Sequence, residues 1–187
     1  MQRSDIVQAA AQIFRQKGYH AASMQDIADA VGLQKASLYH HVESKQDILL
    51  AILDQVLDLL IGDLEQVVES DLSPDEKLRR AMHVYLQRLT KDSDLASVLL
   101  FDYRSLDPSL RSRQNARRDA YENLWRQIVR QGIKEGAFRK VDEAVTVFAL
   151  LGLQNWTITW FRKEGRLSAD TLADRFSDLI LDGLRVS

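Results

Sequence analysis

Residues 23–45 read SMQDIADAVGLQKASLYHHVESK, and this stretch decides the fold that we predict for the chain. Ser23 stands three residues before Asp26, the spacing of a capping box, in which a hydroxyl and a carboxylate satisfy free N–H groups at a helix start. Gly32 follows an apolar run and can adopt the left-handed backbone of a tight turn without a Cβ penalty. Two short helices joined by such a turn form a helix-turn-helix.

The residues before this stretch predict a third helix that packs against the other two. Its apolar residues recur at spacings of three and four, the pattern of one buried helix face. They are Ile6, Ala9, Ala10, Ile13 and Phe14. We therefore expect short helices near 3–17, 24–30 and 34–40 to share a small apolar core.

The composition favours a helical protein with a real core. The 187 residues are 45% hydrophobic and include only 8 glycines and 2 prolines. Cysteine is absent, which excludes disulfides, thiolate metal sites and cysteine nucleophiles. The formal net charge is -2, so any basic surface for nucleic acid must be local. The first residues lack the apolar run of a signal peptide, and we expect a cytoplasmic protein.

Helix-start and helix-stop residues divide the rest of the chain into longer helices. Ser44, Ser73-Pro74 and Ser168 mark starts, and Gly136 and Gly165 mark stops. These helices are expected near 45–70, 74–91, 94–104, 108–135, 142–164 and 168–185. The sequence thus predicts an all-α fold of about nine helices, with a helix-turn-helix DNA-binding domain at 1–47 and a ligand-binding and dimerisation bundle at 48–187.

Residues 144–161 form an uncharged segment that tests whether the chain spans a membrane. Its length, about 18 residues, is near that of a spanning helix. However, Gln154, Asn155 and three threonines interrupt it. A helix that packs on a domain core with one face and on a partner chain with another is also apolar on most sides. We therefore expect no membrane span.

The third short helix carries polar groups suited to reading DNA. The second helix of a helix-turn-helix lies in the major groove with its early residues toward base edges. Glutamine can pair with adenine, and lysine can reach guanine or a phosphate. The expected DNA contacts are Ser23, Gln34, Lys35, Ala36, Ser37, Tyr39, His40 and Lys45. The alternative is a helical module that never touches DNA, since residues 1–47 carry five basic and five acidic side chains.

A resemblance to a known family supports the DNA-binding interpretation. The pattern runs Ile6-x-x-Ala9-Ala10-x-x-x-Phe14-x-x-x-Gly18-Tyr19 and then Ser23-Met24-x-Asp26-Ile27-Ala28-x-x-Val31-Gly32-Leu33-x-Lys35-x-Ser37-Leu38-Tyr39-His40-His41-Val42-x-Ser44-Lys45-x-Asp47-Ile48-Leu49. It resembles the DNA-binding domain of the tetracycline-repressor (TetR) family. The resemblance implies a dimeric bacterial transcription regulator, usually a repressor, with operator DNA as partner. Val42 departs from the phenylalanine more common there but remains apolar.

The adjacent histidines His40 and His41 do not predict a metal site. Neighbouring residues on a helix point about 100° apart, so these two cannot readily grip one ion. The only other histidines are His20 and His83. We expect neither a metal nor another cofactor.

The last two predicted helices are candidates for a homodimer interface. The final helix adds apolar residues to the broad apolar surface of residues 144–161. They are Leu172, Phe176, Leu179, Ile180 and Leu184. Two such helices from each chain would form a four-helix interface. The alternative is that both helices pack only within one chain.

Aromatic residues of the middle helices predict a pocket for a small effector. The candidate effector residues are Phe101, Arg104, Tyr121, Trp125, Phe148, Asn155 and Trp156. Aromatic residues at helical spacing are equally the normal filling of a bundle core. A drug or dye is an alternative effector. A helical-bundle carrier or enzyme is the rival class, although no nucleophile–base motif or glycine-rich phosphate loop is present.

A second resemblance concerns the effector. Arg104-Ser-Leu106-Asp-Pro108, Gly132-x-x-x-Gly136-x-Phe138-Arg139 and Gly152-x-x-Asn155-Trp156 are similar to a TetR subgroup whose members respond to acyl-CoA thioesters. The implied effector is an acyl chain on anionic CoA. Several arginines then become candidates for its phosphates, with ordinary solvated side chains as the alternative. They are Arg104, Arg111, Arg113, Arg117 and Arg118.

Overall fold

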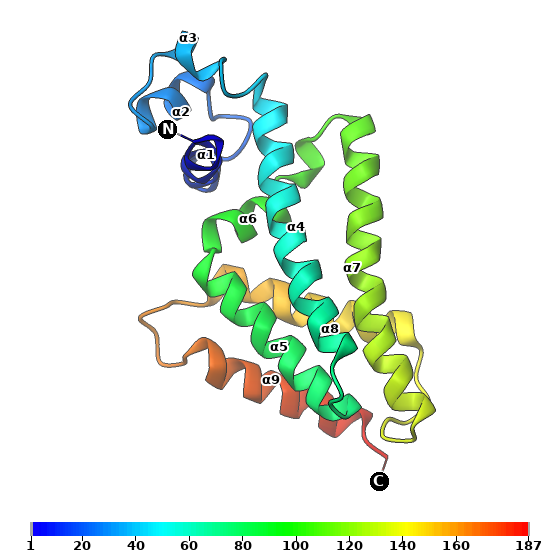
Figure 1. Cartoon of the computed structure of the whole chain (residues 1–187). Coiled ribbons are helices and arrows are strands. Elements are labelled where there is room, and N and C mark those ends of the chain that lie inside the picture. Colours follow the sequence, from blue (N-terminus) through cyan, green and yellow to red (C-terminus); the bar gives the residue numbers. More distant parts are fainter. Residues whose placement is uncertain (1, 187) are drawn as a thin grey trace. The chain divides into compact units, whose positions relative to one another are not determined.

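The structure, a computed structural model that describes residues 2–186, is built of helices (Figure 1). Within that range the α-helices are α1 (Arg3–Lys17), α2 (Met24–Ala30), α3 (Lys35–Leu38), α4 (Lys45–Glu69), α5 (Pro74–Lys91), α6 (Ser93–Phe101), α7 (Pro108–Lys134), α8 (Glu143–Trp160) and α9 (Ala169–Leu184). A short 3-10 helix, η1 (Tyr103–Ser105), follows α6. The predicted all-α fold is confirmed.

The largest differences from the predicted boundaries concern the ends of α8, α6 and α3. Helix α6 ends at Phe101, not near residue 104, and η1 follows it. Helix α3 ends at Leu38, not near residue 40, because the backbone continues with tight bonds from His40 N to Ser37 O (3.2 Å) and from His41 N to Leu38 O (3.0 Å). Bonds over three residues tighten a helix end into a turn. Helix α8 ends at Trp160, and Gly165 N bonds to Arg162 O (2.9 Å) in the turn that follows.

The chain packs as two compact units. The first consists of residues up to Asp58 together with Asp92–Arg117, and the second of Leu59–Lys91 together with Arg118 onward. This division by packing differs from the functional division predicted at residue 47, which stays a prediction.

The core of the first unit includes the predicted three-helix core, to which α4 adds the buried Ile48 and Ile52. Ile6, Phe14, Ile27 and Leu38 are each 0–1% exposed. Helix α6 packs on α1, and Arg15 reaches across to Asp94 (2.6 Å). The turn between α2 and α3 contains Gly32 at φ 68, in the left-handed region that the sequence required of it.

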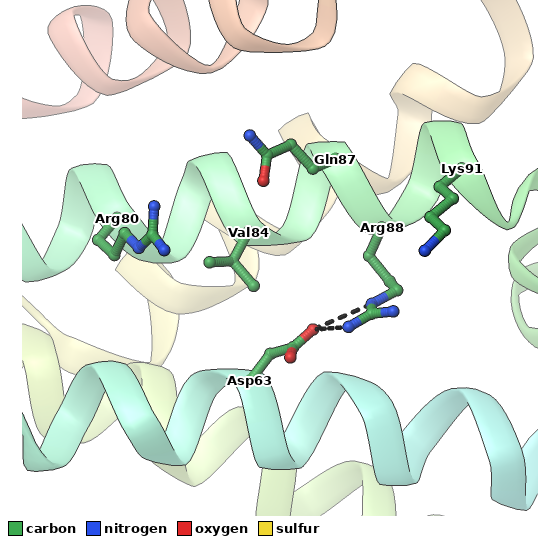
Figure 2. A pocket seen from close by; sticks show the side chains of 6 residues that line it. All are labelled: Asp63, Arg80, Val84, Gln87, Arg88 and Lys91. Carbon is green, nitrogen blue, oxygen red and sulfur yellow. Dashed lines mark hydrogen bonds and ion pairs between the residues drawn. The ribbon is translucent and has the colours of Figure 1, made fainter.

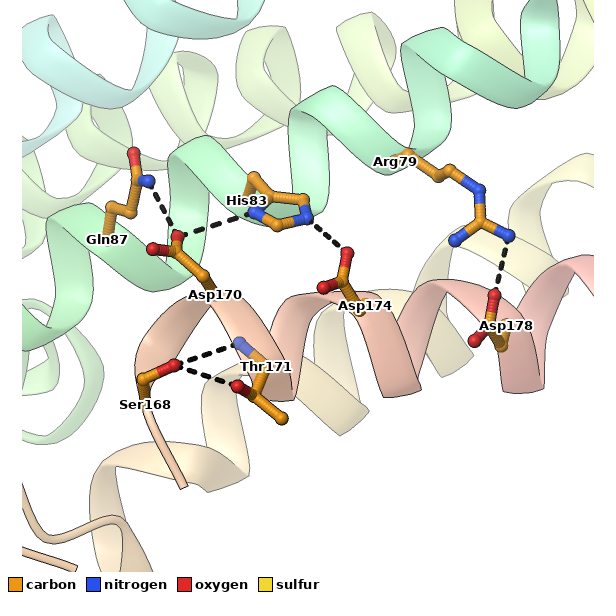
Figure 3. A network of polar contacts seen from close by, with 8 residues as sticks. All are labelled: Arg79, His83, Gln87, Ser168, Asp170, Thr171, Asp174 and Asp178. Carbon is orange, nitrogen blue, oxygen red and sulfur yellow. Dashed lines mark hydrogen bonds and ion pairs between the residues drawn. The ribbon is translucent and has the colours of Figure 1, made fainter. Parts of the chain in front are cut away.

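The second unit is held together along α5 and α9, which pack side by side. Three polar pairs join these helices at regular spacing (Figure 3). They are Arg79 with Asp178 (2.5 Å), His83 with Asp174 (2.7 Å) and Gln87 with Asp170 (2.7 Å). Both sets recur every four residues, so each lies on one face of its helix. This polar face fixes α9 and leaves its opposite face free.

A glycine at the end of α7 allows one close contact in the second unit. The buried Phe138 ring packs onto Gly132, where an added Cβ would lie 2.1 Å from it. Phe138 N donates to Gly132 O (3.0 Å), and Arg139 N donates to Leu184 O (2.7 Å) at the end of α9. The segment after α7 therefore anchors the last helix.

No helix within residues 2–186 is long and apolar enough to cross a bilayer.

Candidate functional site

The start of α2 has the predicted capping box. Asp26 N donates to the Ser23 hydroxyl (3.1 Å), and Ser23 N donates to the Asp26 carboxylate (2.8 Å). Lys17 also contacts that carboxylate (2.6 Å). The hydrogen bonds from Lys17 and Ser23 hold the pKa of Asp26 well below its usual value. Ser23 thus has a structural partner, and its predicted contact with a phosphate stays a prediction.

Helix α3 presents polar side chains to solvent above a buried anchor. Leu38 is 0% exposed, whereas Tyr39 is 48% exposed. Ser37 is half-buried, and the other predicted contacts nearby are exposed: Gln34, Lys35, Ala36 and His40. The buried leucine holds the short helix on the core, so the exposed groups are available to a groove of DNA.

Lys45 is engaged within the fold. Its ammonium donates to the Tyr19 and Ala22 carbonyl oxygens, both at 2.8 Å, and lies 4.4 Å from the centre of the Tyr19 ring. These partners belong to the loop between α1 and α2. The sequence did not reveal this role, and the predicted contact of Lys45 with a DNA phosphate stays a prediction beside it.

One face of α8 is apolar and exposed. Val145, Phe148, Trp156 and Trp160 are 43–66% exposed and follow a helical stripe that passes Gly152. Leu179 of α9 is likewise 65% exposed. An exposed apolar stripe of the kind that α8 carries is a candidate interaction surface.

Four predicted effector residues lie elsewhere than expected. Phe148 and Trp156 lie on the outer face of α8, opposite the buried Val147 and Gln154, because residues three or four apart share a face. They do not line the interior of the unit. Phe101 is 57% exposed, and Arg104 is exposed, donating to the Tyr103 hydroxyl (3.3 Å). Both residues belong to the first unit.

The other three predicted effector residues gather in the interior of the second unit. Tyr121 and Trp125 are 7% and 0% exposed. The Tyr121 hydroxyl faces Trp125 and the buried amide of Gln154. Tyr85 donates to the Asn155 side-chain oxygen (2.6 Å). We call these five residues the interior cluster. Burial raises the pKa of both tyrosines, so they remain neutral hydroxyl groups.

A groove with positive side chains lies along α4 and α5 (Figure 2). Its volume is about 280 Å³, and it is lined by Asp63, Arg80, Val84, Gln87, Arg88 and Lys91. Arg88 donates twice to Asp63, at 3.0 and 2.7 Å. Arg80 and Lys91 have no ion pair with any residue that the structure describes. The groove is therefore a candidate site for an anionic group.

The sequence did not single out this groove, although its spacing carried a signal. Arg80, Val84, Arg88 and Lys91 stand four, four and three residues apart and share one face of α5. The arginines predicted to bind phosphates mostly have partners in the first unit. Arg113 and Arg117 contact Asp54, at 3.1 and 2.8 Å. These two arginines thus have partners within the fold, and their predicted contact with phosphates stays a prediction.

Comparisons with known proteins identify the family of both parts of the chain. Residues 6–52 match the model described as bacterial regulatory proteins, tetR family, and residues 71–184 match the tetracyclin repressor-like C-terminal domain. The HTH-type transcriptional repressor KstR2 of Rhodococcus jostii (strain RHA1) is 28% identical over 184 residues, which cover 97% of this chain and 90% of that protein.

Two solved structures extend the likeness over nearly the whole fold. The TetR family transcriptional regulator PfmR from Thermus thermophilus is 40% identical, with a TM-score of 0.89, over 97% of this chain and 99% of that one. AibR, solved in complex with isovaleryl coenzyme A and operator DNA, is 30% identical, with a TM-score of 0.88, over 96% and 97%.

The fold and the exposed polar face of α3 define a DNA-binding protein of the helix-turn-helix class. With both family models matched, the chain belongs to the TetR family of transcriptional regulators. It is a DNA-binding transcriptional regulator, as the sequence predicted.

Proposed function

We propose that the protein is a repressor that binds a palindromic operator as a homodimer and leaves it when a small effector binds. The observation that carries the proposal is the exposed polar face of α3, held over the buried Leu38. Two copies of such a helix read successive major grooves about 34–36 Å apart, or somewhat farther along the duplex. The proposed role is regulatory, not catalytic, and we propose that the protein acts in the cytoplasm.

The proposed dimer forms through α8 and α9. Phe148 and Trp156 lie at the centre of an exposed apolar stripe, and Leu179 adds to it from α9. The opposite face of α9 is taken up by its polar pairs with α5. The same two helices from a second copy would cover the stripe as a four-helix interface.

The proposed effector is an acyl-CoA. AibR, whose structure contains isovaleryl coenzyme A, provides a chemical precedent among the relatives described above. In this chain the α4–α5 groove offers Arg80 and Lys91 for the phosphates of CoA. The interior cluster offers a buried and neutral environment suited to an acyl chain.

Footprinting with random duplexes would find the operator, and fluorescence anisotropy would then measure its affinity. We expect a dimer to protect a palindrome and isovaleryl-CoA, or a longer acyl-CoA, to weaken the complex at least tenfold. A transcription assay decides between repression and activation. Tight operator binding that no acyl-CoA weakens would refute the effector class, and release by an aromatic drug or dye would replace it.

A further inference from the structure

The interior cluster contains buried polar atoms without satisfactory partners. The Trp125 indole nitrogen and both amide atoms of Gln154 have no hydrogen bond of normal geometry within residues 2–186. Both side chains are 0% exposed. Buried polar groups are almost always hydrogen-bonded in folded proteins, so an unpaired set calls for a ligand, a water molecule or another specific explanation.

The unpaired atoms are mainly donors. Trp125 offers one N–H and Gln154 offers two, beside the hydroxyl of Tyr121. The one unpaired acceptor is the Gln154 side-chain oxygen, to which the Tyr121 hydroxyl can donate. The single Tyr121 oxygen cannot satisfy all three N–H groups of Trp125 and Gln154 at once. The site therefore has N–H donors available for one further acceptor oxygen.

We propose that the interior cluster binds the acyl carbonyl oxygen of the effector, with Trp125 and Gln154 as the donors. This inference rests on the proposed function and specifies the chemistry of its ligand: a neutral acyl compound. A neutral carbonyl suits this site better than a charged carboxylate, because burial disfavours charged forms and raises the pKa of both tyrosines of the cluster. In an acyl thioester, the carbonyl oxygen is the one strongly polar atom of the acyl group, which is the part that would enter an apolar core.

The α4–α5 groove and the interior cluster are electrostatically connected. Asp63, which lines the groove, is close enough to Tyr121 to raise the pKa of its hydroxyl further. An acyl-CoA that places its phosphates near Arg80 and Lys91 would direct its neutral end toward this part of the unit. The two sites thus match the two ends of one molecule.

The test compares acyl-CoA thioesters with S-alkyl-CoA thioethers of the same chain length, which lack only the carbonyl oxygen. Isovaleryl, octanoyl and palmitoyl pairs would be titrated into the full-length protein by calorimetry. We expect the wild type to bind its preferred thioester at least tenfold more tightly than the matching thioether. Trp125→Phe and Gln154→Leu should abolish this preference, because each removes donors and keeps an apolar side chain.

Ser177→Ala is the matched control. Ser177 is likewise 0% exposed with an unpaired hydroxyl, but it lies on α9 and outside the interior cluster. This variant should keep the preference for the thioester. Without ligand, Gln154→Leu should unfold at the wild-type temperature or above it, since it removes an unpaired buried amide.

Each outcome decides a different statement. Equal binding of thioester and thioether by the wild type overturns the inference and leaves the acyl-CoA proposal standing. A preference that survives both substitutions overturns it too, because the carbonyl then binds elsewhere. A clear loss of thermal stability in unliganded Gln154→Leu would overturn it as well, because the amide would then have a stabilising partner without any ligand. If no CoA compound binds while operator binding persists, the acyl-CoA proposal itself fails.

Discussion

Replacing Lys45 by methionine separates a role in folding from a role in DNA binding. Methionine keeps the apolar length of the side chain and removes only the ammonium. The change deletes two charge-assisted hydrogen bonds of 2.8 Å, to Tyr19 O and Ala22 O, and the contact with the Tyr19 ring. Because Lys45 is partly exposed, solvent weakens these bonds, and each is given the free energy of an ordinary neutral hydrogen bond.

At about 1 kcal/mol for each of the two hydrogen bonds and about 0.5–1 kcal/mol for the ring contact, Lys45→Met should cost about 2.5–3 kcal/mol. For a chain of this size, that loss lowers Tm by about 5–12 °C. Differential scanning calorimetry without DNA measures the shift. Operator affinity should fall as well, because the loop between α1 and α2 loses its anchor.

Lys35→Met is the matched control. Lys35 is exposed on α3 and forms no ion pair within residues 2–186, so its replacement should leave Tm nearly unchanged. It should reduce operator affinity, and the salt dependence of binding should fall by about one unit if Lys35 contacts a phosphate. The reasoning about Lys45 is refuted if Lys45→Met melts like the wild type and shows only the reduced salt dependence.

Three further predictions test other parts of the structure. Gly132→Ala should destabilise the fold by about 1–3 kcal/mol in urea unfolding, because its Cβ would overlap the Phe138 ring, whereas Gly62→Ala, with open space at its Cβ, should not. Asp26→Asn should reduce the free energy of unfolding most at neutral pH. The difference in this free energy between variant and wild type should shrink as pH falls below the usual carboxyl pKa toward the lowered pKa of Asp26. A difference that does not change with pH would contradict this. Trp156→Glu should give monomers in analytical ultracentrifugation, and a dimer of unchanged stability would exclude this face of α8.

The sequence predicted the first unit well because its signals are local. The capping box at Ser23 and the turn at Gly32 depend on residues three or four positions apart, and the structure has both. The orientation of α8 could not be predicted in the same way. A helix that is apolar on most sides has no polar stripe to show which face is buried, so Phe148 and Trp156 were placed in the interior.

Long side chains limited the prediction of the functional sites. Lys45 lies 23 residues after Ala22, yet its flexible stem reaches that carbonyl. The pairing of Asp63 with Arg88 likewise depends on how α4 and α5 pack, which no local pattern encodes. Tyr121 and Trp125 lie near one another in the structure, but the sequence could not predict that the buried Gln154 lies beside them with unpaired amide atoms.

The packing of α1 against α6 has a practical consequence for dissecting the molecule. Arg15 of α1 forms an ion pair with Asp94, nearly eighty positions later in the chain. A fragment that contains only residues 1–47 would therefore lack this partner. Such a fragment would leave part of α1 uncovered and would tend to aggregate. A fragment able to fold on its own would need residues 48–58 and 92–117 as well, because these complete the first unit.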